Sequence, residues 1–133
     1  MKKKQSAFVY RSIKRYKYQL IAPHSYQVDI FPTIGIETEF LRLDQTGLLT
    51  IKKYYAWDGP SGPTFDTETF LRASLVHDAL YQLIRTRQLR PNFRRSADRI
   101  LKKICLEDGM SKFRAWYVFK AVRLFGGIWQ KYA

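Results

Sequence analysis

The chain is poor in cysteine, histidine and long apolar runs. Its 133 residues include one cysteine, Cys105, so an intramolecular disulfide is excluded, as is typical of proteins that work in a reducing compartment. No apolar run follows the lysines at positions 2–4, so we expect no secretory signal. No stretch reaches the ~18 consecutive apolar residues of a membrane span, so we also expect no transmembrane segment.

Acidic residues are scarce and unevenly placed. Lys and Arg number 24 against 11 Asp and Glu, which gives a net charge of +13. Residues 2–17 and 111–133 carry no acid, and residues 85–103 carry eight basic side chains with Asp98 as their one acid. Such a field attracts nucleic acid, an anionic membrane surface or an acidic protein, and charge alone does not choose among them.

Hydrophobic residues make up 46% of the sequence and aromatic residues 16%, which predicts a packed core. At this length we expect a single domain, residues 1–133, with a β-rich part (1–56, including a basic N-terminal arm) followed by a loop and a helical part (57–133). Strands are predicted at 16–22, 26–31, 34–44 and 48–56. Leu41 and Leu43 alternate with polar residues and lead into a hairpin turn at 44–47.

From about Asp66 the hydrophobic period becomes helical. A first helix is predicted after an N-cap at Asp66 or Thr67, and a second is predicted to begin after Pro91 and Asn92 and to end near Gly109. A third helix, capped by Ser111, is expected to end before the glycine pair at 126–127. Its apolar side is predicted to carry Ala115, Trp116, Phe119, Val122 and Phe125. The predicted fold class is α+β, an antiparallel β-meander followed by about three helices.

A histidine and two carboxylates could meet in the helical part. His77 and Asp78 are adjacent in the first helix and point about 100° apart, so they face two parts of one site. Tyr81 borders both, because it follows one turn later. Asp98, on a second helix packed antiparallel to the first, could hydrogen-bond a ring nitrogen of His77 and leave the other as a general base. A packing pair is the competing interpretation.

Hydrolysis by a histidine-activated water also requires stabilisation of an oxyanion, which a cation bound close by can provide. The loop at 57–63 has two glycines and two prolines, so its carbonyls can converge, and Asp58 and Asp78 add carboxylate oxygens. Calcium suits an oxygen-rich loop of this kind, whereas zinc favours His and Cys ligands. A plain turn between strand and helix is the competing interpretation.

These motifs resemble those of the phospholipase A2 superfamily, above all its compact bacterial and fungal members. The resemblance rests on Asp58-Gly59-x-Ser61-x-Pro63, His77-Asp78-x-x-Tyr81 and Asp98, and on the tail at 115–126. It implies that His77 is the general base, that Asp98 orients it and that Tyr81 supports the pair. It further implies a calcium site formed by Asp58, Asp78 and loop carbonyls from Gly59 through Ser61 to Gly62, and hydrolysis of the sn-2 ester of a phospholipid.

The full-length layout is more similar to a phage- and prophage-associated family of unknown function, domain of unknown function family 1353. The shared signature is Asp-Gly-x-Ser-x-Pro, His-Asp-x-Leu-Tyr and Ala-Asp. This resemblance implies a protein of the host cytoplasm or the phage virion.

Three functions follow as hypotheses. The first is a calcium-dependent esterase acting on anionic membrane lipid, with Phe8, Tyr10, Trp129 and Tyr132 as interfacial anchors. The second is a non-catalytic virion, tail or accessory protein that packs against other phage structural proteins. The third is a nucleic-acid-binding protein that uses residues 2–17 and 85–103.

Three further residues have no catalytic role in these hypotheses. We expect His24 to be exposed in a turn and Cys105 to be a small core residue. Tyr117 is expected either to join the hydrogen bonds around Asp98 or to pack in the core.

Overall fold

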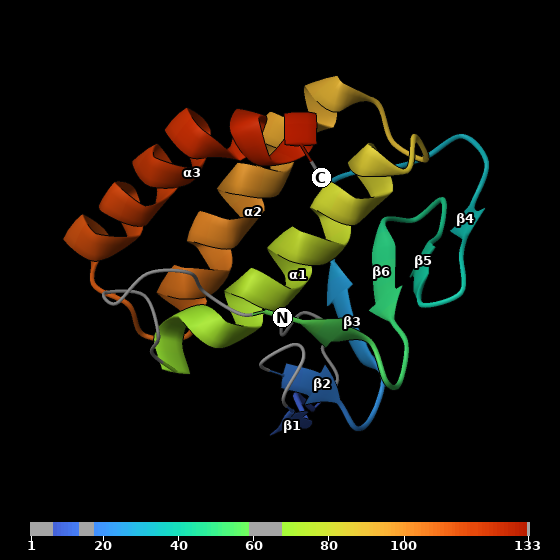
Figure 1. Cartoon of the computed structure of the whole chain (residues 1–133), viewed down its shortest axis with the longest axis horizontal. Coiled ribbons are helices and arrows are strands. Elements are labelled where there is room, and N and C mark those ends of the chain that lie inside the picture. Colours follow the sequence, from blue (N-terminus) through green and yellow to red (C-terminus); the bar gives the residue numbers. More distant parts are fainter. Residues whose placement is uncertain (1–6, 14–17, 59–67, 133) are drawn as a thin grey trace. The chain divides into compact units, whose positions relative to one another are not determined.

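The computed structural model describes residues 7–13, 18–58 and 68–132, with side chains described as far as Phe125. The chain divides into two compact units, Met1–Gly59 and Pro60–Ala133. Described residues of the first unit form strands and those of the second form helices (Figure 1). The predicted α+β class, with antiparallel strands before three helices, is therefore confirmed. The single domain expected from the length stays a prediction.

The first unit holds two small antiparallel sheets. One has the strand order β1-β2-β7 and the other β3-β6-β5-β4. Their strands are β1 (Tyr10–Ser12), β2 (Tyr18–Leu20), β3 (His24–Gln27), β4 (Ile36–Glu37), β5 (Leu41–Leu43), β6 (Leu48–Ile51) and β7 (Ala56–Trp57). Strands β4, β5 and β6 form the expected meander, and β3 pairs with the other edge of β6.

Apolar side chains of the larger sheet gather on one face because strand side chains alternate. Leu41 and Leu43 of β5 pair with Ile51 and Leu49 of β6, and all four are buried. Arg42, between the two leucines, is exposed, as the alternation predicted. The register therefore fixes which face of this sheet carries the core of the unit.

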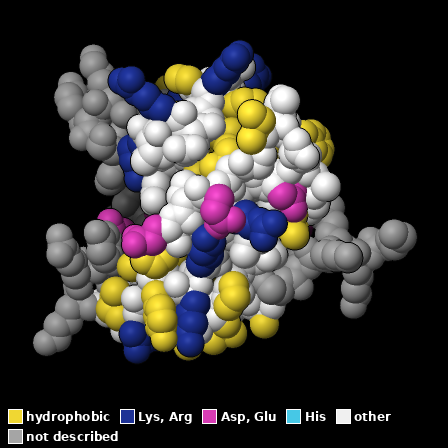
Figure 2. Space-filling model, turned by 90° about the vertical axis from the view of Figure 1, so that its right-hand side faces the viewer, with side chains coloured by type: hydrophobic (Ala, Val, Ile, Leu, Met, Phe, Trp, Pro, Cys, Tyr) yellow, Lys and Arg dark blue, Asp and Glu magenta, His cyan; other side chains and the backbone are white. Residues whose placement is uncertain are grey.

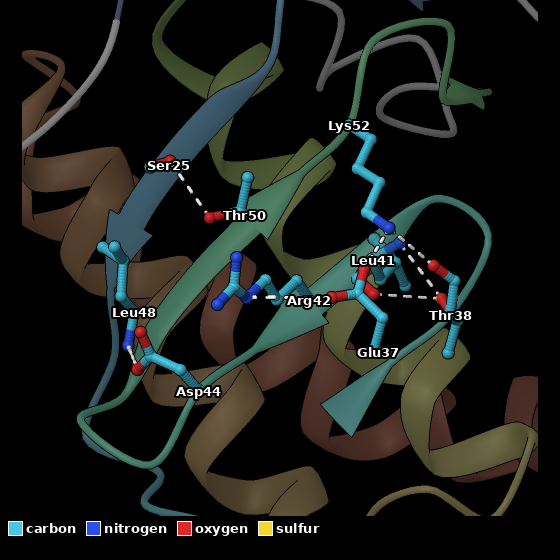
Figure 3. A network of polar contacts seen from close by, with 9 residues as sticks. All are labelled: Ser25, Glu37, Thr38, Leu41, Arg42, Asp44, Leu48, Thr50 and Lys52. Carbon is cyan, nitrogen blue, oxygen red and sulfur yellow. Dashed lines mark hydrogen bonds and ion pairs between the residues drawn. The ribbon is translucent and has the colours of Figure 1, made fainter. Parts of the chain in front are cut away.

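The opposite face of this sheet is polar (Figure 3). Glu37 of β4 pairs with Arg42 of β5 at 3.7 Å and with Lys52, whose ammonium also donates to the carbonyl of Thr38 at 2.9 Å. The surface drawn in Figure 2 mixes hydrophobic, basic and acidic side chains, and no single kind covers it. Exposed ion pairs of this kind set the register more than they add stability.

The turn between β5 and β6 is held by Asp44, as the hairpin prediction required. Its carboxylate accepts hydrogen bonds from the backbone N–H groups of Thr46 (2.9 Å) and Leu48 (3.0 Å), shown in part in Figure 3. The hydroxyl of Thr46 also donates to it and is the main cause of a lowered pKa of Asp44. Gly47 completes the turn at φ 85°, a conformation that residues with a Cβ rarely adopt.

We predict that Gly47→Ala destabilises the strand unit. An alanine Cβ there would lie 2.5 Å from the carbonyl oxygen of Val28, in addition to the unfavourable φ, so the free energy of unfolding should fall by about 1–3 kcal/mol. Urea unfolding measures the change. Gly35→Ala is the control, because its Cβ would meet no atom nearer than 3.9 Å. Equal losses in both variants would contradict the turn argument.

Three strand predictions need correction. The strand predicted at 34–44 is broken into β4 and β5 by a turn in which Thr38 accepts the N–H of Leu41 at 3.0 Å. The strand predicted at 48–56 ends at Ile51, because the chain turns through Tyr54 at φ 77° before β7. The strand predicted at 26–31 lies instead at His24–Gln27. Strand β1 lies within the predicted basic arm and was not anticipated. The breaks within 34–44 and 48–56 arise from turns that the apolar pattern does not encode.

The second unit is a layer of three helices, α1 (Glu68–Arg85), α2 (Arg94–Glu107) and α3 (Lys112–Tyr132), with a short 3-10 turn, η1 (Pro91–Phe93), before α2. In Figure 1, α2 lies between α1 and α3 and runs antiparallel to α1. None of the helices in the described part of the chain is sufficiently long and apolar to cross a membrane.

An ion pair joins the start of α1 to the end of α2. The guanidinium of Arg72 donates to both carboxylate oxygens of Asp108, at 3.0 and 2.8 Å, and to Glu107 at 3.2 Å. Burial lowers the pKa of Arg72, but the pairing with Asp108 and Glu107 outweighs burial and raises it. This bidentate contact fixes the antiparallel register of the two helices.

The structure confirms one helix boundary and corrects others. Ser111 caps α3, since its hydroxyl accepts the N–H of Arg114 at 3.2 Å. However, α3 continues through the glycine pair at 126–127, because a helical glycine costs only about 1 kcal/mol relative to alanine. Trp116 and Phe125, expected on the apolar side, are exposed. The N-cap predicted at Asp66 or Thr67 lies outside the described residues.

Candidate active site

Asp98 is the centre of a buried polar network in the helical unit. Its side chain is 0% exposed, and its carboxylate lies 2.7 Å from Nε2 of His77 and 2.5 Å from the hydroxyl of Tyr81. Both contacts are to Oδ1, whereas Oδ2 accepts from Arg123 at 2.7 Å. The three residues that the sequence pointed to therefore come together, and Arg123 joins them.

Helix geometry explains how these groups meet. His77 and Tyr81 are four residues apart on α1, so they share one face, and their ring centroids lie 4.1 Å apart. Asp98 lies in the first half of α2, which the antiparallel arrangement brings beside the second half of α1. Tyr81 therefore restricts the His77 ring from one side while Asp98 holds its Nε2 atom.

Asp98 is ionised at neutral pH despite its burial. Burial raises the pKa of its carboxyl, but the hydrogen bond and charge interaction with His77, with the hydrogen bonds from Tyr81 and Arg123, outweigh this and lower it. An ionised carboxylate only accepts hydrogen bonds, so Nε2 of His77 must carry the proton of the 2.7 Å contact. In the neutral imidazole, the lone pair is then on Nδ1, as a general base requires.

Tyr81 acts as a hydrogen-bond donor in this network. Burial raises the pKa of its hydroxyl, and the neighbouring negative charge of Asp98 raises it further, so the phenol keeps its proton. His77 and Tyr81 thus both donate to Oδ1 of Asp98. The hydroxyl fixes the position of the carboxylate that orients His77.

Two arginines on the other side of Asp98 were missed by sequence reasoning. Besides the 2.7 Å contact from Arg123, Arg94 lies 3.8 Å from Oδ2, one turn before Asp98 on α2. The sequence feature that could have pointed to Arg123 is its position in α3. Arg123 follows Phe119 by four residues and Ala115 by eight, which places it at the edge of the buried side. A cation at such an edge requires a buried anion nearby.

Asp78 faces a different direction from His77, as adjacent helical residues do. Its side chain is 42% exposed, and its Oδ1 lies 4.0 Å from Nδ1 of His77, beyond hydrogen-bond distance. Asp78 is therefore the acid on the side of His77 opposite to Asp98. This position is compatible with a cation ligand beside Nδ1 of His77.

The structure leaves the predicted calcium loop largely undescribed. Asp58 is exposed after β7 in the first unit, whereas Gly59, Ser61 and Gly62 lie outside the described residues. Within residues 7–13, 18–58 and 68–132, no group of three or more His, Cys, Asp and Glu side chains could hold a metal ion. Calcium binding by this loop and Asp78 therefore stays a prediction.

The expectations for the other singled-out residues have mixed outcomes. His24 is 1% exposed rather than exposed, because it begins β3 on its inward side, with Nδ1 3.3 Å from the carbonyl of Ala7. Both histidines of the chain are buried, and no histidine side chain is visible on the face drawn in Figure 2.

Cys105 is a core residue, as predicted, and burial raises the pKa of its thiol to about 12. Tyr117 is half-exposed, so the core position is wrong.

Fold and network together define the class of this protein: an α+β protein whose helices bury a histidine–aspartate–tyrosine network with an arginine. The chain belongs to the family described as "Protein of unknown function (DUF1353)", whose model matches residues 36–122. The matched segment contains His77, Tyr81 and Asp98 and ends one residue before Arg123. No curated protein and no solved structure matches the chain.

We predict that Asp98→Asn lowers the free energy of unfolding by roughly 2–4 kcal/mol at neutral pH, since it leaves Arg123 without its carboxylate partner. The native pKa of Asp98 is below its unfolded value, so its stabilisation is complete above the unfolded pKa of ~3.9 and is lost as pH falls through the native pKa. The difference between wild type and variant should therefore shrink below about pH 4.

Chemical denaturation across this pH range measures the difference. Asp29→Asn is the control, because this exposed aspartate lies in the strand unit and its substitution should change stability by less than about 0.5 kcal/mol. A difference for Asp98→Asn that stays constant into strong acid would contradict an ionised, paired Asp98.

Proposed function

We propose that this protein is a phage-encoded, phospholipase A2-like hydrolase that cleaves a phospholipid ester with a water molecule activated by His77. The observation that supports the proposal is the 2.7 Å contact between Nε2 of His77 and Oδ1 of Asp98 across two antiparallel helices. Tyr81 on the same oxygen completes the arrangement that the sequence resemblance implies. The family assignment names no activity, so the proposal rests on this geometry and the motifs.

The residues perform three tasks in this proposal. Nδ1 of His77 removes a proton from water as the water oxygen attacks the ester carbonyl. Asp98 stabilises the resulting imidazolium, and Tyr81 and Arg123 keep the carboxylate in place. His77 then returns the proton to the departing alcohol. A positioned base of this kind contributes roughly 10²–10⁴ in rate.

Calcium would supply electrostatic stabilisation of the oxyanion when bound. Asp78 is suitable as one ligand because its carboxylate is half-exposed beside His77. Asp58 and the carbonyls of 59–62 would contribute the remaining oxygens, which calcium prefers over nitrogen or sulfur.

We predict release of fatty acid from anionic phospholipid vesicles by the wild-type protein in the presence of calcium. His77→Ala should abolish it, and Asp98→Asn should reduce it by about 10²-fold or more, because the imidazole loses its orienting charge. Cys105→Ala is a matched control, since this buried thiol has no role in the reaction. Fatty-acid release, quantified by mass spectrometry, measures the activity. Intact folding without turnover would contradict the proposal.

We predict that calcium raises the melting temperature of the wild-type protein but not of Asp78→Ala. A ligand that binds only the folded state stabilises it in proportion to the logarithm of its concentration over Kd. Asp29→Ala, which removes another exposed carboxylate, should retain the shift, and magnesium should produce a smaller one because it demands stricter octahedral geometry. Equal shifts of the melting temperature in wild type and Asp78→Ala would show that Asp78 is not a calcium ligand.

A specific observation favours a second candidate, a non-catalytic virion or accessory protein. His77 and Tyr81 hydrogen-bond Oδ1 of Asp98 and Arg123 hydrogen-bonds Oδ2, so both oxygens of the buried carboxylate have protein partners. A buried polar network of this kind also serves as a structural link between helices. Folded, calcium-insensitive protein that assembles with phage structural proteins would support this candidate. DNA binding with a steep salt dependence, unchanged by His77→Ala, would instead support nucleic-acid binding.

A further inference from the structure

Helix α3 has apolar residues on two opposite sides. Ala115 and Val118 are buried on the side that packs on α2. On the outward side, Phe113 is 76% exposed and Leu124 72% exposed, and Trp116 is about half-exposed. Trp116 follows Phe113 by three positions and Leu124 follows Trp116 by eight, which places the three residues on one helix face. A large exposed apolar face of this kind marks an interaction site rather than a solvated surface.

The outward face of α3 (Phe113, Trp116, Tyr117, Lys120 and Leu124) continues into a basic surface on α2. The ammonium of Lys102 lies 5.6 Å from the ring centroid of Phe119, at the junction of the two helices. On α3 itself, the ammonium of Lys120 lies 6.0 Å from the ring of Trp116. Beyond Lys102, the outward side of α2 exposes Arg95, Arg99 and Lys103. Cations of both helices therefore lie beside aromatic rings of α3.

The acidic groups of α2 are paired with other residues of the helical unit. Asp98 is buried against His77 and Arg123, and Glu107 and Asp108 at the end of α2 pair with Arg72. Residues 111–133 contain no acid in sequence. Within the described side chains, Arg95, Arg99, Lys103 and Lys120 form no ion pair, so this surface complements an anionic partner.

We infer that the outward face of α3, with the basic side of α2, docks on an anionic lipid bilayer. An amphipathic surface with Trp and Phe beside Lys and Arg lies in the membrane interface, where rings enter the headgroup region and lysine stems reach toward phosphate. Leu124 favours lipid over nucleic acid, since a protruding aliphatic side chain cannot stack on bases as an aromatic ring does and gains little from phosphates. The inference deepens the proposed function and rests on it for the choice of lipid over protein.

Binding is tested by co-sedimentation with vesicles, without measuring turnover. The wild-type protein should bind vesicles of equal parts phosphatidylglycerol and phosphatidylcholine and not vesicles of phosphatidylcholine alone. The double variant Phe113→Ser/Leu124→Ser should weaken the partition coefficient by at least about tenfold, because two apolar side chains no longer enter the interface. Lys120→Glu should weaken it by more than about fivefold, since each cation near an anionic membrane contributes about 1 kcal/mol and the new carboxylate is also repelled.

Matched controls lie in the strand unit. Ile34→Ser removes an equally exposed apolar side chain, and Lys53→Glu reverses an exposed charge; both should bind vesicles as wild type does. Circular dichroism confirms that each variant is folded. Vesicle binding that is lost in His77→Ala but kept in the double variant would overturn the inference.

Three other outcomes would also overturn it. Equal binding to both vesicle types would contradict the charge argument. Concentration-dependent dimerisation that the double variant abolishes, without vesicle binding, would assign the face to a second copy of the chain. Tighter binding to DNA than to vesicles, lost in Arg95→Glu, would assign it to nucleic acid. Vesicle binding without fatty-acid release would retain this inference while the proposed hydrolase activity fails, so the two are distinguishable.

Discussion

The helical unit depends on the burial of one charged carboxylate. Asp98 is removed from solvent, and an unpaired charge there would be strongly destabilising. Its partners come from all three helices: His77 and Tyr81 from α1, Arg94 from α2 itself and Arg123 from α3. The helices must therefore pack in the one arrangement that brings these donors to the carboxylate. Packing and site geometry have the same physical cause.

A second ion pair fixes the other end of the same helices. Arg72 near the start of α1 holds Asp108 and Glu107 at the end of α2, whereas His77 and Asp98 join the second half of α1 to the first half of α2. With both ends tied, α1 cannot slide along α2 by a turn without breaking a buried contact. The position of the His77 ring is therefore set by contacts on either side of it.

Helix α3 combines two tasks on different sides. The edge of its buried side supplies Arg123 to Asp98, and its outward side exposes Phe113 and Leu124. In the proposed lipid-docked state, the helix that meets the bilayer is thus the one that supports the carboxylate behind His77. This arrangement links a membrane-facing surface to the candidate catalytic pair through a single rigid element.

The sequence by itself determined what depends on near neighbours in the chain: the α+β division, the alternation around Arg42, the turn at Asp44–Gly47 and the Ser111 cap. It also pointed to His77, Tyr81 and Asp98, because helical spacing and the scarcity of His and acidic residues limited the choices. The break within 34–44 and the course of α3 through its glycines were also not anticipated, because hydrophobic periodicity does not encode a local side-chain turn or the tolerance of a helix for glycine. Only the tertiary structure decided that Arg123 pairs with Asp98, that Arg72 pairs with Asp108 and that His24 is buried. These three features depend on contacts between residues far apart in sequence, whose energies local periodicity does not contain.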